Sequence, residues 1–128
     1  MPDSAKKILI VDDEPDVVLY LKTFLEDNGF VTIIAENGKE GMQKAIVEKP
    51  DLITLDITMP EESGVRMFRD LQENDEMCKT PVIIISGVTI EFKKFINSRR
   101  QVSAPNAYFE KPINRDDLLT KINEILGL

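Results

Sequence analysis

The feature that most constrains the fold is a set of short apolar runs that alternate with longer amphipathic stretches. Each run has the length of a β-strand, and its unbroken apolar character is typical of strands buried on both faces of a parallel sheet. Such alternation favours right-handed crossovers with helices on both faces. We therefore predict an α/β fold, a doubly wound five-stranded parallel sheet flanked by five helices. The predicted strands are residues 8–11, 31–35, 52–55, 82–85 and, less strongly apolar, 107–109.

Local signals place the helices between these strands. Pro15 suits the first turn of a helix because its φ angle is fixed. A second helix is expected over about 38–49, a third from near Ser63, a fourth around 90–97 and a last one after Asn114, which is a good N-cap. The second helix is expected to turn three apolar side chains towards the sheet: Met42, Ala45 and Ile46.

Composition limits the number of domains and the kinds of partner. With 128 residues, of which 42% are hydrophobic, the chain suits one compact domain over 1–128. The net charge of −7 argues against direct binding to nucleic acid or to an anionic membrane, since both require a basic surface. No apolar stretch approaches the roughly 20 residues of a membrane span. A lone cysteine, Cys78, and an N-terminus without a secretory signal indicate a soluble, cytoplasmic protein.

Acidic side chains follow two of the predicted strands. Asp12 and Asp13 come directly after the first strand, and Asp56 comes directly after the third. Because parallel strands collect ligands at their carboxyl ends, these carboxylates are expected to meet at one edge of the sheet. Clustered carboxylates repel one another unless a cation lies among them, and Mg²⁺ prefers such oxygen ligands. The alternative is that Asp12, Asp13 and Glu14 only decorate the N-terminus of the first helix, and that Asp56 is a turn or cap residue.

Two further polar residues, Ser86 and Lys111, follow the fourth and fifth strands. With them, the chain resembles the receiver domain of bacterial two-component response regulators over essentially all 128 residues. The resemblance rests on four segments in order: ILIVDDEP, DLITLDITMP, PVIIISG and YFEKP. It implies a flavodoxin-like fold with strand order 2-1-3-4-5, a choice that the alternation of strands and helices leaves open.

The resemblance also implies roles for individual residues. Asp56 would be the nucleophile that becomes an aspartyl phosphate, and Lys111 would place its ammonium against a phosphoryl oxygen. Asp13 would bind Mg²⁺ directly, with Asp12 acting through a water or as a second ligand, and Thr58 would offer its backbone carbonyl to the metal.

Three more positions match the family. Ser86 would donate a hydrogen bond to the phosphoryl group, and Tyr108 would turn inward when Ser86 moves, so that phosphorylation changes the surface. The peptide bond before Pro112 would be cis, which aims Lys111 inward. Read on their own, Ser86 is a turn cap and Tyr108 is a half-buried aromatic on an edge strand.

The chain contains no histidine, so a phosphohistidine donor must come from a separate sensor histidine kinase or phosphotransfer protein. By resemblance, the downstream effector, output domain or second copy in a homodimer would bind the face made by the fourth helix, fifth strand and fifth helix. The stretch before Lys111 is longer than in typical receivers, and its basic residues form either a solvated face or a docking surface: Lys93, Lys94, Arg99 and Arg100. Val88 lies where some rapidly dephosphorylating receivers carry a polar residue, which predicts a long-lived phosphorylated state.

The leading interpretation is therefore a phosphoacceptor signalling domain that is not a conventional enzyme. One alternative is a receiver-like interaction module that works without phosphate. Another is a phosphatase of the haloacid dehalogenase type, although such enzymes carry a second aspartate two residues after the nucleophile, and Thr58 occupies that position here. Since the chain ends after the last predicted helix, no output domain is expected to follow within it. A stand-alone receiver and a part of a larger regulator or hybrid kinase both fit the sequence.

Overall fold

A computed structural model describes residues 5–87 and 107–128 of the chain. Its strands are β1 (Lys7–Val11), β2 (Val31–Ala35), β3 (Leu52–Asp56), β4 (Val82–Ser86) and β5 (Ala107–Glu110). Its helices are α1 (Pro15–Asp27), α2 (Gly38–Glu48), α3 (Ser63–Glu73) and α5 (Arg115–Leu126), with a 3₁₀ turn, η2 (Pro60–Glu62), before α3. Within the described ranges, no helix combines the length and the apolar character that a membrane span requires.

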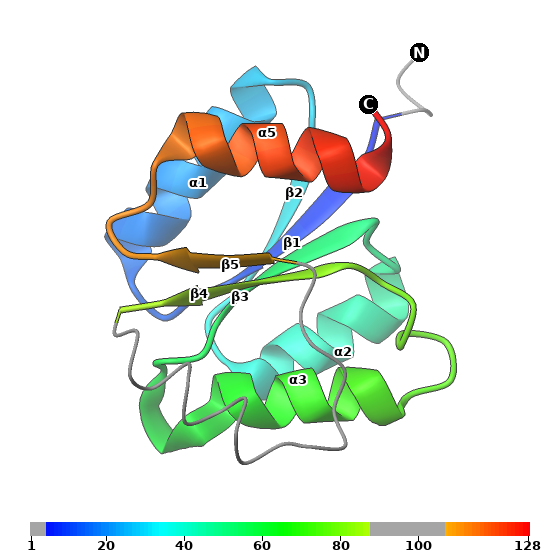
Figure 1. The fold of residues 1–128 in the computed structure, drawn as a ribbon. Helices are drawn as coiled ribbons and strands as arrows, with labels where there is room; N and C mark the ends of the chain where they lie inside the picture. The colour runs from blue at the N-terminus through cyan, green and yellow to red at the C-terminus, as the bar shows by residue number, and fades with distance from the viewer. Residues whose placement is uncertain (1–4, 88–106) are drawn as a thin grey trace.

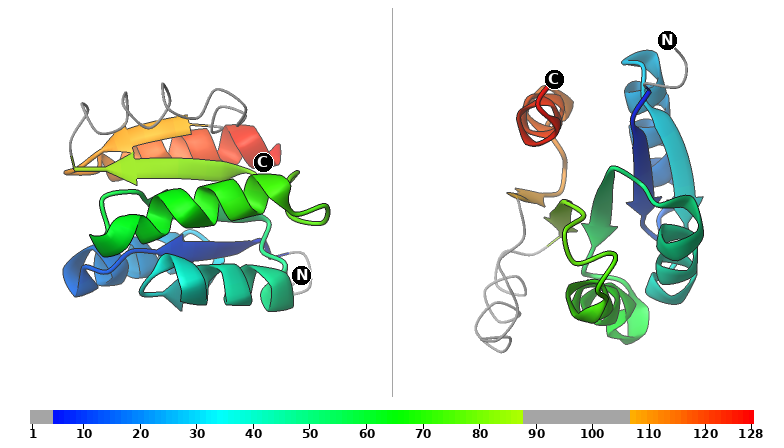
Figure 2. Two further views of the ribbon diagram at one scale, coloured as in Figure 1. Left: turned by 90° about the horizontal axis from the view of Figure 1, so that it is seen from below. Right: turned by 90° about the vertical axis from the view of Figure 1, so that its right-hand side faces the viewer.

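The five strands form one sheet in the order β2-β1-β3-β4-β5, and every neighbouring pair is parallel. This confirms both the predicted parallel sheet and the strand order that the family resemblance implies. Helices α1 and α5 cover one face of the sheet, and α2 and α3 cover the other (Figure 1). Since the strands run in the same direction, their carboxyl ends gather at one edge (Figure 2).

One apolar layer covers each face of the sheet. Along β1, Ile8 and Ile10 pack with α1 and α5, whereas Leu9 and Val11 pack with α2 and α3. All four are at most 1% exposed. Burying one such aliphatic side chain stabilises the fold by about 1.5–3 kcal/mol. Strands of this kind are continuously apolar because both of their faces are covered.

Side chains fix the start of two helices. The Asn37 side chain accepts a hydrogen bond from the backbone amide of Glu40 at 2.8 Å, and Asn114 accepts one from the amide of Asp117 at 3.0 Å. Both bonds satisfy amides that have no partner inside the helix. The predicted N-cap at Asn114 is therefore confirmed.

One predicted core position is wrong. Ile46 is 46% exposed, while Gly38, Gly41 and Ala45 form the buried side of α2. The approach to α3 is close, since a Cβ atom on Gly41 would lie 2.6 Å from the sulfur of Met67. Ala45 faces inward as predicted and Met42 packs against the core, but the two glycines that allow this approach are overlooked by a search for apolar side chains.

Part of the prediction falls on residues 88–106, which lie outside the described residues. This applies to the fourth helix, to Val88 and to the four basic residues of the lengthened stretch: Lys93, Lys94, Arg99 and Arg100. The described ranges contain four α-helices, and each lies where a helix was predicted.

Candidate functional site

The carboxyl ends of four strands bring the predicted site residues together. Asp56 is the last residue of β3 and pairs in register with Ile85 of β4. Ser86 is the last residue of β4 and pairs with Glu110, next to Lys111. The backbone amide of Lys111 donates to the carbonyl of Ser86 at 2.9 Å. Asp12 follows β1, so one edge of the sheet collects side chains from distant parts of the chain.

Asp56 is 1% exposed and both of its carboxylate oxygens have partners. Oδ1 accepts hydrogen bonds from the backbone amide of Thr58 at 2.8 Å and from its hydroxyl at 2.6 Å. Oδ2 accepts a hydrogen bond from the Lys111 ammonium at 3.1 Å. These contacts fix the orientation of the carboxylate, which leaves Oδ2 on the side of the positive charge.

The ammonium of Lys111 lies among three carboxylates. It is 3.1 Å from Asp56 and 3.2 Å from Asp12, and it also forms an ion pair and hydrogen bond with Glu14. Burial lowers the pKa of Lys111, but the hydrogen bonds to Glu14 and Asp56 and the charges of Asp56 and Asp12 outweigh burial and raise the pKa above its ordinary value. Lys111 therefore stays charged at neutral pH.

Asp12 is 2% exposed, and its carboxylate accepts fewer hydrogen bonds than that of Asp56. Its Oδ1 accepts from the backbone amide of Glu14 at 2.9 Å, whereas its Oδ2 accepts no hydrogen bond from the described residues and has only the ion pair with the Lys111 ammonium at 3.2 Å. Burial raises the pKa of Asp12 to about 6, and the charge of Asp56 adds to this, although the Glu14 amide and Lys111 act in the opposite direction. A buried carboxylate oxygen that has one ion pair and no hydrogen bond can still accept a second cation.

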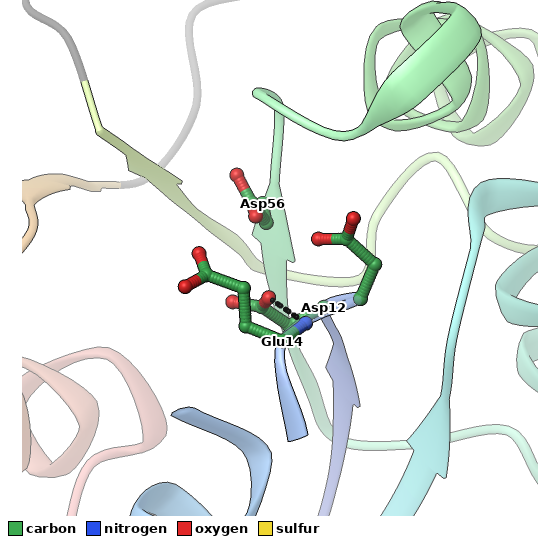
Figure 3. Close-up of side chains that lie close together, drawn as sticks. Asp12, Glu14 and Asp56 are labelled. Carbon is green, nitrogen blue, oxygen red and sulfur yellow. Dashed lines mark hydrogen bonds between the residues drawn. The ribbon is translucent and has the colours of Figure 1, made fainter. Parts of the chain in front are cut away.

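The site has the donor set that Mg²⁺ prefers. Carboxylate oxygens of Asp12, Asp13, Glu14 and Asp56 all lie within 4.8 Å of one another. Figure 3 shows Asp12, Glu14 and Asp56 converging from the loop after β1 and the end of β3. Asp13 and Glu14 are exposed, so the cluster opens to solvent on one side. Hard oxygen ligands beside a solvent opening fit an ion that keeps part of its water shell.

The remaining predicted residues lie around this cluster. Ser86 is fully buried at the end of β4, and the Lys111–Pro112 peptide bond is cis. Tyr108 on β5 is partly buried and packs against the apolar layer shared with α2 and α3. Phe109 packs on the opposite face of the sheet, with α1 and α5. The structure therefore gathers Asp12, Asp13, Asp56, Thr58, Ser86 and Lys111 at one edge, whereas Tyr108 lies further back along β5.

Two residues at this site were not predicted to belong to it: Glu14 and Gly64. Glu14 contacts Lys111, although 97 positions separate them in the chain. Gly64 packs against the backbone of Asp56, since a Cβ atom there would lie 2.1 Å from the carbonyl oxygen of Asp56. An acidic residue that follows two other acids at a strand end is a signal for the first. A glycine inside the first turn of a helix, where it costs stability, is a signal for the second.

Comparisons with known proteins agree with this geometry. Residues 8–123 match the response regulator receiver domain. The chain is 37% identical over 121 residues to protein PilH of Pseudomonas aeruginosa, which covers 94% of this chain and 98% of PilH. It is 34% identical to the alkaline phosphatase synthesis transcriptional regulatory protein PhoP of Bacillus subtilis, over 94% of this chain but 48% of that protein. A CheY-like receiver domain protein from Methanospirillum hungatei JF-1 has a TM-score of 0.83 at 31% identity, covering 97% of this chain and 95% of that one.

Proposed function

The chain belongs to the response regulator receiver domain family, and on this premise we propose that Asp56 is the residue that accepts a phosphoryl group. Receiver domains are phosphoacceptor signalling domains of two-component systems and not conventional enzymes. One observation carries the choice of Asp56: its carboxylate is buried at the end of β3 and is held between Thr58 and the Lys111 ammonium. A fixed carboxylate beside a fixed positive charge is prepared to attack phosphorus.

The proposed transfer replaces one bond to phosphorus with another. A carboxylate oxygen of Asp56 forms the new O–P bond while the P–N bond of a phosphohistidine breaks. The electron pair of that bond stays with the imidazole nitrogen, which takes up a proton from solvent. Since the chain has no histidine, the donor belongs to a sensor histidine kinase or phosphotransfer protein. Lys111 pairs with the phosphoryl oxygens as their charge develops.

Mg²⁺ is the proposed cofactor. The carboxylates of Asp12, Asp13 and Asp56 and the backbone carbonyl of Thr58 would hold it. The proximity of the carboxylate oxygens supports this assignment, as does the buried Oδ2 of Asp12, which has the Lys111 ion pair but no hydrogen bond from the described residues. When bound, the ion supplies positive charge to phosphoryl oxygens. Asp12 keeps its own charge in the site by accepting the Glu14 amide and by lying 3.2 Å from the Lys111 ammonium.

The signalling output is proposed to start at Ser86. This hydroxyl would donate to the phosphoryl group, and Tyr108 would repack when Ser86 moves, which alters the surface near β5 and α5. A phosphoryl group adds about two negative charges and three acceptor oxygens, enough to bias such a change. The partner would be an effector, an output domain or a second copy of the chain. The proposal includes a single receiver domain over 1–128, a cytoplasmic location and loss of the phosphoryl group by hydrolysis.

Incubation with Mg²⁺ and acetyl phosphate, followed by intact mass measurement, tests the proposal. The wild type is expected to gain the mass of one phosphoryl group, and Asp56→Asn is expected to gain none. Asp75→Asn is the matched control because Asp75 is an exposed aspartate between α3 and β4. EDTA should abolish the gain. No gain in the wild type, or an equal gain in Asp56→Asn, contradicts the proposal. Sustained turnover of an aryl phosphate would instead favour a phosphatase.

A further inference from the structure

We propose that Glu14 is a positioning residue that holds the Lys111 ammonium in the unphosphorylated protein and competes with the phosphoryl group for it. The inference rests on the proposed function, because it concerns the same lysine. Glu14 is contributed by the N-terminus of α1 and Lys111 by the loop after β5, so the contact joins two elements that meet only in the folded chain.

The contacts of Lys111 explain the competition. Its ammonium has three N–H donors, and carboxylates of Asp12, Glu14 and Asp56 surround it. When a phosphoryl group forms on Asp56, that carboxylate loses its charge and releases one N–H donor of Lys111, but a second donor can reach the phosphoryl oxygens only after Asp12 or Glu14 gives it up. The side chains of Asp12 and Asp56 are 2% and 1% exposed and are held by backbone amides. Glu14 is 57% exposed, so water can replace Lys111 around its carboxylate.

Glu14 is well suited to a test because its side chain makes no capping hydrogen bond to α1. It occupies the N-cap position without making a side-chain capping bond. Its backbone amide donates to Asp12, and its carbonyl accepts from the amide of Val18 at 3.1 Å. A glutamine at this position keeps both backbone bonds and the length of the side chain. It removes one negative charge, which attracts Lys111, belongs to the carboxylate cluster and favours the N-terminus of α1.

Removing this contact should make phosphoryl capture easier. For Glu14→Gln, we expect about threefold tighter binding of beryllofluoride with Mg²⁺, which is the size of change that one exposed ion pair produces. Half-maximal phosphorylation should also need about threefold less acetyl phosphate, while the maximal rate changes less. Calorimetry measures the first quantity, and intact mass at several donor concentrations measures the second.

Two control variants separate the contact from the general effect of charge. Glu14→Asp keeps the charge but shortens the side chain by one methylene, and aspartate at an N-cap favours bonding to the helix amides. It is expected to resemble Glu14→Gln. Glu36→Gln removes an equal charge beside Asp12 and Asp13, at an exposed position outside the ion pairs of Lys111 within the described residues. It is expected to resemble the wild type.

The outcomes distinguish the inference from the proposed function. If the wild type binds neither beryllofluoride nor a phosphoryl group, the proposed function fails. If the wild type is phosphorylated but Glu14→Gln binds beryllofluoride no more tightly, only the role of Glu14 is wrong. Two results would show that the net charge near the site, and not the contact with Lys111, sets the affinity for beryllofluoride. One is an equal gain in affinity in Glu36→Gln, and the other is a Glu14→Asp variant with the affinity of the wild type. The ¹⁵N signal of the Lys111 ammonium should shift in Glu14→Gln and not in Glu36→Gln.

Discussion

The interior of the central strands and their carboxyl ends are equally buried, yet they are filled by opposite chemistry. Leu55 is 0% exposed and Asp56, the next residue, is 1% exposed; Val11 is 1% exposed and Asp12 is 2% exposed. Burial of the apolar residue stabilises the fold, whereas burial of a charged group costs free energy unless the charge is paired. One residue further along each strand, burial therefore costs free energy instead of stabilising the fold, and the buried carboxylates form the candidate site.

The largest expected effect comes from weakening the apolar side of this comparison. Leu55→Ala should lower the free energy of unfolding by about 3 kcal/mol, because it leaves a cavity beneath the site. Urea unfolding measures this change. Leu19→Ala is the control, since Leu19 is 63% exposed and should change stability by about 0.5 kcal/mol or less. Equal losses in the two variants would contradict the assignment of Leu55 to the core.

An intermediate effect is expected where the packing of a helix meets the site. In Gly64→Ala, the added Cβ atom would lie 2.1 Å from the backbone oxygen of Asp56, so β3 or α3 must shift. We expect a loss of about 1–3 kcal/mol in unfolding free energy, together with slower phosphorylation. Gly87→Ala is the matched control because its nearest neighbour, the Thr58 hydroxyl, would be 3.9 Å away. If both variants are phosphorylated at the wild-type rate, the close packing does not constrain Asp56.

The smallest expected effect is a gain in the free energy of unfolding, not a loss. In EDTA, Asp12→Asn is expected to raise the free energy of unfolding at pH 7 by about 1–2 kcal/mol, because a buried charge is removed and only part of the gain is lost with the Lys111 ion pair. Urea unfolding measures the gain. Asp16→Asn, in the exposed first turn of α1, should instead lose a few tenths of a kcal/mol.

The gain in Asp12→Asn should depend on pH. Folding raises the pKa of Asp12 from 3.8 to about 6, so between these values the folded protein holds a proton that the unfolded chain has released. The contribution of Asp12 to stability therefore falls as pH rises through this window, and the advantage of Asp12→Asn should grow from pH 4 to pH 7. A constant advantage would show that this carboxyl group is not the source.

Much of the fold could be predicted because its signals are local. The strands at residues 52–55 and 82–85 were each found to within one residue, since a strand buried on both faces leaves an unbroken apolar run. Pro15 in the first turn of α1 and the N-cap Asn114 of α5 depend on neighbouring residues alone. Ile46 was misassigned because the buried side of α2 is set by how closely α3 approaches, which depends on residues about 25 positions away.

The candidate site also has a part that local sequence patterns predict and a part that depends on the tertiary structure. Asp12, Asp13, Asp56, Ser86 and Lys111 were identifiable from the sequence because each directly follows a strand or ends it, and the ends of parallel strands meet at one edge. The contact between Glu14 and Lys111 was not identifiable, because it requires the N-terminus of α1 to reach the loop after β5. The close packing of Gly64 on Asp56 was missed for a related reason: no pattern of polarity marks the distance between two backbones.

The sequence by itself determined the alternation of strands and helices and the positions where polar side chains interrupt buried strands, because burial periodicity and capping depend on near neighbours. The tertiary structure alone decided which carboxylates share the Lys111 ammonium, which carboxylate oxygen of Asp12 lacks a hydrogen bond and which small residues let α2 approach α3. Those features depend on distances between segments far apart in the chain. Such distances exist only once strand order and helix packing have been set.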